Sequence, residues 1–305
     1  MKPIVVVGSI NMDLVSRTNR IPRPGETIIG SSFEMHSGGK GANQAVAVAR
    51  LGHPSILLGA IGDDVFGRQL LETLKGFGVD ISHIRSAQQI SGVASIVVDA
   101  AGENSILVVP GANLAVTPEY LETKLDLIQE AALVLAQLEI PLESIAWLAE
   151  TCSRYGIPFM LDPAPAAELP DAVLRKVTWF TPNQTEASFY APNCETAEES
   201  VTRLFDRGIA NVILKRSSGG ALVATQDGSR EWIPAFSVTA IDTTAAGDAF
   251  NGAFATSLAR GSSVKDAARF ASAAAAISVT RRGAQPSLAD EQEVTELLRS
   301  RNEVS

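Results

Sequence analysis

Short apolar runs alternate with longer segments of helical spacing along most of this chain. The apolar runs, each typical of a buried β-strand, occupy residues 4–8, 55–62, 132–139, 158–162, 177–183 and 211–215. Between several of them, apolar positions three and four apart predict helices over residues 41–51, 65–78 and 142–156. This alternation is typical of βαβ units, so we predict an α/β fold with a mostly parallel sheet and helices on both faces. Ligands of such folds bind beyond the carboxyl ends of the strands.

Two segments depart from this alternation. Residues 12–37 contain β-type stretches without a helical pattern, and residues 92–109 are typical of two strands joined by a turn. We predict that together they form a small β-sheet lid beside the ligand site. An edge extension that serves only dimerisation is the other interpretation. The chain ends in predicted helices over 246–260, 263–281 and 289–300, and without a linker or repeat we expect residues 1–305 to form a single domain.

The stretch SGGKGANQA, residues 37–45, places three glycines around Lys40 immediately before a predicted helix. A phosphate-binding Walker A loop needs glycine six residues before its lysine and Ser or Thr directly after it. This chain has Glu34 and Gly41 at those positions. The stretch is therefore predicted to be a glycine turn at a helix N-terminus, which brings backbone N–H groups close to a polar ligand.

Composition narrows the class of ligand. The chain has 305 residues, of which 46% are hydrophobic and 19% charged, and this excludes wholesale disorder. Its net charge of −9 argues against a nucleic-acid or membrane-surface partner and favours a small molecule. The two cysteines and three histidines have no metal-ligand spacing. Because no segment resembles a signal peptide or a membrane span, we expect a cytoplasmic protein.

The stretch IDTTAAGDAFNGAFATSLARG, residues 241–261, carries the strongest chemical signal. Helical periodicity begins just after Gly247, so Ala245, Ala246 and Gly247 lie where N–H groups are unpaired, and Asp248 lies in the first helical turn. An acidic residue there can simply offset the helix dipole by roughly 0.3–1 kcal/mol. Alternatively, the N–H groups bind a phosphate while the carboxylate reaches an acceptor hydroxyl.

The segment DTTAAGDAFNG resembles the signature of the ribokinase (PfkB) family of carbohydrate kinases. GSINMD, GGKGANQA, QLE, TPNQTEA and TRRGAQPS resemble further motifs of that family, in the same order along nearly the whole chain. The resemblance implies an ATP-dependent sugar kinase with a lid sheet and a homodimer formed through the lids. It also implies that Asp248 is the catalytic base and that Ala245, Ala246 and Gly247 form the anion hole.

By the same resemblance, the glycine turn holds the sugar. The residues implied to contact it are Asn11, Asp13, Gly39, Lys40, Asn43, Glu139 and Asp248. Carboxylate and amide groups suit a polyhydroxylated ligand, because each can bond two hydroxyls. Turn capping by Asn11 and Asp13 and a solvated strand end at Glu139 are the structural alternatives.

The resemblance also implies the nucleotide and ion sites. The ATP-binding residues are Asn183, Glu186, Lys215, Arg216, Ser217, Ser218, Gly219, Gly220, Gly247 and Ser272, with Mg²⁺ organised largely through water. Ser217 departs from the family pattern, in which glycine is common. A monovalent cation site, with K⁺ as the expected activator, would comprise Asp242, Thr244, Val279, Arg282, Ala284 and Ser287. An ordinary tight loop is the alternative for that set.

The implied reaction is transfer of the ATP γ-phosphoryl group to the 5-hydroxyl of D-ribose. Kinases of 2-deoxyribose, of a nucleoside or of another sugar remain alternatives, as does a non-catalytic sugar-binding regulator. Asp13 and Glu139 would repel the second phosphate of a sugar-phosphate acceptor. The intact pair of Gly247 and Asp248 argues against a regulator.

Overall fold

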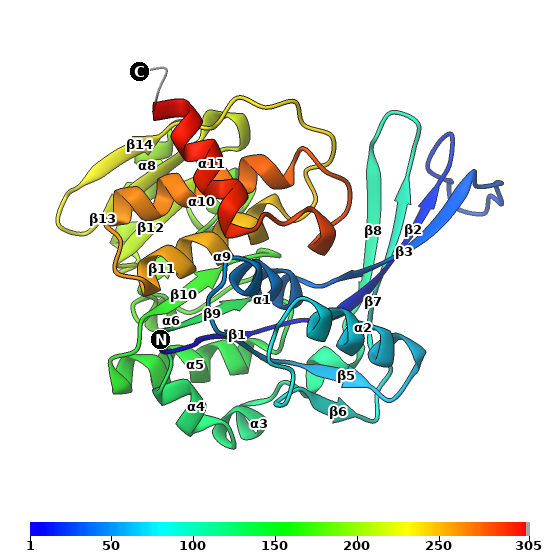
Figure 1. Ribbon diagram of the computed structural model, residues 1–305, viewed down its shortest axis with the longest axis horizontal. Helices are drawn as coiled ribbons and strands as arrows, with labels where there is room; N and C mark the ends of the chain where they lie inside the picture. Colours follow the sequence, from blue (N-terminus) through cyan, green and yellow to red (C-terminus); the bar gives the residue numbers. More distant parts are fainter. Residues whose placement is uncertain (303–305) are drawn as a thin grey trace.

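A large sheet and a small sheet organise the computed structural model, which describes residues 1–302 (Figure 1). The large sheet has eight strands in the order β14-β13-β12-β11-β10-β9-β1-β4. Their bounds are β14 Arg230–Ile233, β13 Ala221–Thr225, β12 Asn211–Lys215, β11 Trp179–Phe180, β10 Phe159–Asp162, β9 Leu133–Gln137, β1 Ile4–Val7 and β4 Ser55–Leu58. Strands β12 to β4 pair in parallel, and only β13 and β14 are antiparallel. The predicted α/β class is confirmed.

Helices cover both faces of the large sheet, as the sequence predicts (Figure 1). One face packs against α1 Lys40–Arg50, α2 Val65–Gly76, α9 Ala246–Ala259, α10 Val264–Ser278 and α11 Glu291–Asn302. The other packs against α3 Pro118–Glu122, α4 Leu125–Gln129, α5 Leu142–Tyr155, α6 Asp171–Leu174, α7 Gln184–Tyr190 and α8 Ala197–Asp206. Alternate residues of β1 serve the two cores: Ile4 and Val6 face α1, whereas Val5 and Val7 face α5. This period of two explains why the buried strands are apolar throughout.

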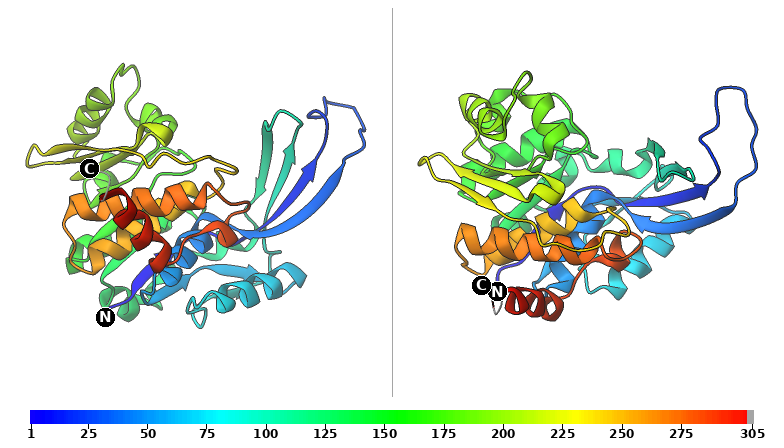
Figure 2. Two further views of the ribbon diagram at one scale, coloured as in Figure 1. Left: turned by 45° about the horizontal axis from the view of Figure 1, so that its top comes forward. Right: turned by 90° about the horizontal axis from the view of Figure 1, so that it is seen from above.

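The small sheet has four strands and projects from the large one (Figure 2). Its order is β3 Ser32–Gly38, β2 Asn11–Arg17, β7 Gly92–Val98 and β8 Asn104–Val109. The predicted sheet from these two segments is therefore present. Asp13, Ala94 and Val108 lie in one cross-strand row, so they share a face of this sheet. All six residues of β8, which forms one edge, are exposed.

The run at 55–62, predicted as one strand, is two strands in two different sheets. After β4 the chain leaves the large sheet, and β5 Ala60–Gly62 pairs with β6 Arg85–Ala87 in a separate ribbon. The break falls at Gly59, where a Cβ atom would lie 2.8 Å from Ile10 Cδ1. Close approach of the Ile10 side chain, and of the Gly8 carbonyl oxygen at 3.1 Å, therefore favours glycine at the break.

The hairpin β13–β14 and the short helices α3, α4, α6, α7 and α8 are absent from the sequence-based prediction. The two hairpin strands have only five and four residues, and β14 is partly exposed, so their apolar signal is weak. The chain segments 41–51, 65–78 and 142–156 do form the predicted helices, as α1, α2 and α5. Within residues 1–302, no helix combines the length and apolar character needed to cross a lipid bilayer.

Candidate active site

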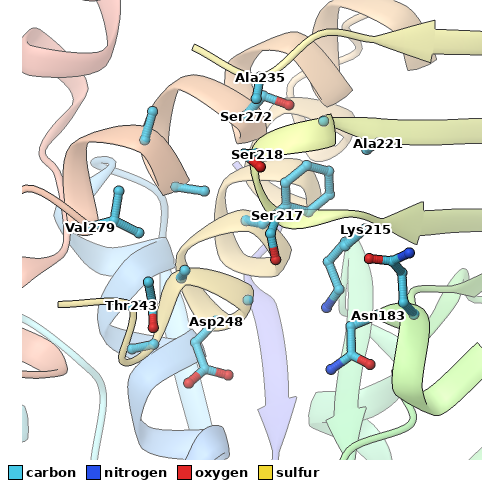
Figure 3. A pocket seen from close by; sticks show the side chains of 18 of the residues that line it. Asn183, Lys215, Ser217, Ser218, Ala221, Ala235, Thr243, Asp248, Ser272 and Val279 are labelled. Carbon is cyan, nitrogen blue, oxygen red and sulfur yellow. The ribbon is translucent and has the colours of Figure 1, made fainter. Parts of the chain in front are cut away.

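The carboxyl ends of the parallel strands and the N-termini of α1 and α9 surround one large cavity. Its volume is about 700 Å³, within the usual range for small-molecule sites. Residues from widely separated segments line it, among them Lys40, Asp162, Asn183, Lys215 and Asp248. In Figure 3 the carboxylate of Asp248 and the ammonium group of Lys215 point into this space. The cavity lies where an open α/β sheet is expected to bind its ligand.

Glycines allow α1 to begin directly against the end of β1. Gly39 caps α1 with a φ of +89°, and a Cβ atom there would lie 2.7 Å from the backbone nitrogen of Asn11. A Cβ atom on Gly41 would lie 2.5 Å from the carbonyl carbon of Gly8. Both contacts exclude a larger residue. The predicted glycine turn thus brings Asn43 and Gln44, near the start of α1, within hydrogen-bond distance of Asp248, which lines the cavity.

Asp248 is buried, with 5% of its surface exposed, in the first turn of α9. Its Oδ2 accepts a hydrogen bond from Asn43 Nδ2 at 2.9 Å, and its Oδ1 accepts one from Gln44 Nε2 at 2.9 Å. Burial raises the pKa of Asp248 to about 6, against the opposing attraction of Lys40. A carboxylate with such a pKa is ionised at neutral pH and basic enough to accept a proton.

The predicted sugar residues gather on one side of Asp248. Burial, followed by the charges of Glu139 and Asp248, raises the pKa of Asp13 to about 7. Glu139 accepts a 2.5 Å hydrogen bond from Ser9 Oγ and a 3.3 Å bond from the backbone N–H of Lys40. Carboxylates concentrated in this way, with amide groups nearby, suit a ligand with several hydroxyl groups.

Asn11 is oriented by a neighbour outside the predicted set. The side chain of Asn113 donates from Nδ2 to Asn11 Oδ1 at 2.7 Å, and its Oδ1 accepts from the backbone N–H of Ile10 at 2.9 Å. Asn113 belongs to a short 3₁₀ helix, Gly111–Ala115, that follows β8. The bond commits Asn11 Oδ1 to the protein, so the amide nitrogen of Asn11 is the group left to bind an acceptor.

Two lysines hold the acidic groups on the other side of Asp248. Lys215 Nζ lies 3.2 Å from Asp162 Oδ1, and both side chains are largely buried. Burial alone would lower the pKa of Lys40, but attraction by Asp248, Asp162, Glu139 and Glu186 raises it above its usual value. Lys40 therefore remains charged between the two sides of the site, although only the sugar side was predicted for it.

Asn183 and Glu186 form a reciprocal cap at the start of α7. Asn183 Oδ1 accepts from the backbone N–H of Glu186 at 2.9 Å, and Glu186 Oε2 accepts from the backbone N–H of Asn183 at 2.7 Å. Both residues also line the cavity. Burial, followed by repulsion from Asp162, raises the pKa of Glu186. The N-x-x-E spacing thus serves a helix cap and also places carboxylate oxygen at the cavity wall.

Most of the predicted nucleotide residues lie at the cavity, and two do not. Those that line it are Asn183, Glu186, Lys215, Ser217, Ser218, Gly220, Gly247 and Ser272. The guanidinium of Arg216 instead lies over the ring of Trp232, 5.5 Å from its centroid, and Gly219 is not part of the lining. Ser217 has a φ of +45°, a conformation that glycine would adopt at lower cost.

The predicted anion hole lies at the N-terminus of α9, where the helix dipole favours negative charge. Ala245 caps the helix in the left-handed region with a φ of +60°, an uncommon conformation for a residue with a Cβ atom. The N–H of Ala246 donates to the carbonyl oxygen of Thr243 at 3.3 Å. The N–H groups of the first helical turn that follow it have no partner within the helix, which leaves Gly247 best placed to bind an anion.

The two loops of the predicted cation site meet, but several of their oxygens already accept protein hydrogen bonds. Asp242 accepts from the backbone N–H groups of Thr244 and Gly283, both at 2.9 Å. The carbonyl oxygen of Val279 accepts from Ile241 and Asp242, and that of Ala284 accepts from Ser287 Oγ. Arg282 is exposed. In this conformation, a cation would have to replace some of these bonds.

Sequence reasoning missed five polar residues of the site: Ser9, Gln44, Asn113, Gln137 and Asp162. Asp162 was within reach, because it ends the predicted strand 158–162 at the edge where ligands bind. Ser9 lies two positions before the predicted residue Asn11, yet serines in turns are common. Gln44 and Gln137 lie within the motifs GGKGANQA and QLE, and that membership is the local signal for them. Their contacts, like those of Asn113, are with residues far away in sequence, and spacing along the chain does not indicate such contacts.

Comparisons with known proteins agree with one another. A model of the pfkB family of carbohydrate kinases matches residues 1–291. A ribokinase of Bacillus subtilis is 42% identical over 98% of this chain and 100% of its own length, and a deoxyribokinase of Salmonella typhi is 36% identical over 97% and 98%. The structure of Arabidopsis thaliana ribokinase, complexed with ribose and ATP, superimposes with a TM-score of 0.92 at 34% identity, covering 98% of this chain and 99% of that one.

Replacing Asp13 by Asn should stabilise the protein at alkaline pH. Folded Asp13 keeps its proton up to a pH of about 7, whereas its unperturbed value is 3.8. The folded state therefore binds more protons, and the free energy of unfolding decreases as pH rises between these values. Asparagine stays neutral, so Asp13→Asn should raise the free energy of unfolding by about 1–4 kcal/mol at pH 8. Urea unfolding at pH 8 and pH 5 should show that this gain shrinks at the lower pH.

A matched control is Asp63→Asn, at a carboxylate whose side chain is 87% exposed. That change should alter the free energy of unfolding by less than about 0.5 kcal/mol at either pH. If Asp13→Asn gave the same difference at pH 5 and pH 8, burial of a charged Asp13 would not be the cause.

Proposed function

Because the chain belongs to the pfkB family of carbohydrate kinases, we propose that it transfers the γ-phosphoryl group of ATP to the 5-hydroxyl of D-ribose. The observation that carries this proposal is the position of Asp248, a buried carboxylate at a helix N-terminus between an acidic sugar side and a lysine-bearing nucleotide side. The ribokinases among its relatives support the choice of sugar. The product is D-ribose 5-phosphate.

In the proposed mechanism, Asp248 accepts the proton of the attacking hydroxyl. Its ionised form is favoured by Lys40 and by the amide donors of Asn43 and Gln44. The sugar is held by Asn11, Asp13, Gly39, Lys40, Asn43 and Glu139. Asn43 then has two functions, because its Nδ2 bonds Asp248 while its buried Oδ1 has no protein partner and is available to a sugar hydroxyl.

The nucleotide side stabilises the phosphoryl group as it leaves ADP. Ala245, Ala246 and Gly247 form the proposed anion hole. The N–H of Gly247 and the positive end of α9 attract the negative charge that develops on the phosphoryl group. Lys215 and Lys40, which both line the cavity, supply positive charge. The other proposed ATP contacts are the predicted nucleotide residues that line the cavity: Asn183, Glu186, Ser217, Ser218, Gly220 and Ser272.

Mg²⁺ is the proposed metal, and it would screen the triphosphate and orient it for in-line transfer. Among residues 1–302, no cluster of three or more His, Cys, Asp or Glu side chains could hold an ion by itself. Glu186 and Asp162 nevertheless present carboxylate oxygens to the nucleotide side. This sparse set fits Mg²⁺, which commonly keeps several waters and binds substrate phosphates.

The small sheet is proposed to act as a lid on a single domain of residues 1–305, with lid segments 12–37 and 92–109. Asp13 and the exposed Val108 lie on the same face of that sheet. This is the face that would turn toward the bound sugar when the lid closes. The opposite face exposes Phe33 by 59% and Leu107 by 67%. Exposed apolar sheet surface of this kind marks an interface. We therefore propose a homodimer of two copies joined through this sheet.

We propose that the protein acts in the cytoplasm. The reaction needs ATP, and both cysteines, Cys152 and Cys194, are free thiols, which suits the reducing cytoplasm.

The proposed substrate can be tested by assaying D-ribose, 2-deoxyribose, nucleosides and sugar phosphates with Mg²⁺ and ATP. We expect the highest kcat/KM for D-ribose. Asp248→Asn should retain the fold and lower kcat by roughly 10²–10⁴-fold, because a general base is lost. A higher kcat/KM for 2-deoxyribose would change the proposed sugar, whereas near-wild-type turnover by Asp248→Asn, with chemistry rate-limiting, would remove the proposed base.

Activation by K⁺ is a separate proposal, based on the contact between the loops at Asp242 and Val279 beside the N-terminus of α9. Adding K⁺ to protein freed of monovalent ions should raise kcat, because the ion would order the backbone N–H groups at Gly247. Steady-state assays at constant ionic strength provide the measurement. Equal rates with K⁺ and with tetramethylammonium would exclude this site.

The proposed dimer predicts that Leu107→Glu yields monomers in sedimentation velocity. The exposed Leu107 side chain is apolar, and a charge there would have to be buried in the interface. Tyr155→Glu, at a 46% exposed aromatic residue at the end of α5, is the matched control and should remain dimeric. A wild-type protein that sediments as a monomer at micromolar concentration would refute the interface.

A further inference from the structure

Gln44 connects two buried carboxylates, Asp162 and Asp248, that line the cavity. It is fully buried, and its Nε2 donates to Asp248 Oδ1 and to Asp162 Oδ2, each at 2.9 Å. An amide nitrogen has two hydrogens, so one can serve each carboxylate. Asp248 is on α9 and Asp162 ends β10, 86 residues apart in numbering (248 − 162). One side chain of α1 therefore holds together groups from two distant segments.

A hydrogen bond from Gln137 fixes the orientation of the Gln44 amide. Gln137, at the end of β9, donates from Nε2 to Gln44 Oε1 at 2.6 Å, and it is also fully buried. The bond commits the oxygen of Gln44 to Gln137 and directs its nitrogen to the two carboxylates. In the opposite orientation, the Gln44 oxygen would face both carboxylates and two acceptors would repel.

Asp162, in turn, is held by Lys215 of the nucleotide side. Its Oδ1 lies 3.2 Å from Lys215 Nζ, while its Oδ2 accepts from Gln44. A continuous chain of polar contacts therefore runs from Lys215 through Asp162 and Gln44 to Asp248. With Oδ1 of Asp248 bonded to Gln44, Oδ2 is the oxygen that lies with Asn43 on the sugar side.

We propose that Gln44 is the positioning residue for the base: its amide holds Asp248 Oδ1 against Asp162 so that Oδ2 faces the acceptor hydroxyl. This inference rests on the proposed function of Asp248 as the general base. Asp162 is then also a positioning residue. Because it contacts both Lys215 and Gln44, a shift of Lys215 would shift Gln44 and, with it, Asp248. Gln44 itself does not touch the reacting atoms.

Charged groups around Asp248 explain why an amide is needed between the carboxylates. Lys40 from α1, Asp162 from β10 and Asp13 from β2 act on Asp248, and Lys215 from β12 lies beside Gly247, the residue before it. Two of these four groups are acidic. Without the Gln44 donor, Asp248 and Asp162 would face each other as like charges, and the ionised form of Asp248 would be disfavoured.

The test compares kcat and KM as functions of pH for the full-length protein with D-ribose, Mg²⁺ and ATP. Gln44→Met keeps the length of an unbranched side chain and removes the donor. We expect kcat at pH 7 to decrease roughly 10- to 100-fold, because a displaced base is costly. The acidic limb of the kcat profile should move up by about one pH unit, the effect of one lost hydrogen bond to a carboxylate. KM for ATP should stay within about twofold, since Gln44 does not line the nucleotide side.

Two further variants separate positioning from a structural role. Ser55→Ala removes a buried 2.9 Å bond to the carbonyl oxygen of Ala45, so it loosens α1 without touching a carboxylate. Its acidic limb should stay in place. Gln137→Met frees the Gln44 amide to turn, and should move the acidic limb in the same direction as Gln44→Met, by less.

The inference fails if Gln44→Met keeps the wild-type acidic limb and loses no more activity than Ser55→Ala. If Gln44→Met does not fold, Gln137→Met decides the matter, and an unchanged acidic limb in that variant overturns the inference. Failure of the proposed function is distinguishable, because then the unmodified protein would phosphorylate no sugar before any variant is compared.

Discussion

Close packing of α1 against β1 and α9 is the constraint on which the site depends. The helix approaches the end of β1 where Gly41 meets Gly8, and it approaches α9 where a Cβ atom on Gly252 would lie 2.5 Å from Ala47 Cβ. At contacts this close a helix has little room to shift, because the interior is tightly packed. It allows Asn43 and Gln44 to reach Asp248, and it aligns two helix N-termini toward one cavity.

The site gathers five acidic side chains close to one another and to Lys40. Asp13, Glu139, Asp162, Glu186 and Asp248 all act on one another or on Lys40. Burial, with added repulsion from acidic neighbours, raises the pKa values of Asp13 and Asp248. Such strain is characteristic of functional sites, because the groups are arranged for a ligand and not for the empty protein. A ligand that supplies hydroxyl donors and a metal cation would relieve it.

The sequence predicts the architecture well and the site in part. Strong apolar periodicity predicted the parallel sheet, α1, α2 and α5, while the weak signal of β13 and β14 was missed. Motifs predicted Asp248 and Asn43, which are hydrogen-bonded in the structure. Asp162 and Gln44 were not predicted, because their importance comes from tertiary contacts. The direction of Arg216 toward Trp232 was equally unpredictable, since a loop residue next to a lysine carries no signal of which way it turns.

The order of strands in the large sheet has a consequence for how the protein is made. Strand β1, at residues 4–7, pairs with β4 at 55–58 and with β9 at 133–137, and α1 packs on α9, at residues 246–259. Strand β1 therefore lacks its second neighbour until residues 133–137 have been synthesised, and long-range pairing of this kind slows folding. Helix α9 is synthesised later still, about two hundred residues after α1. Until α9 has been made, a nascent chain would expose the apolar face of α1 that α9 covers, and chaperones would be needed to protect that face from aggregation.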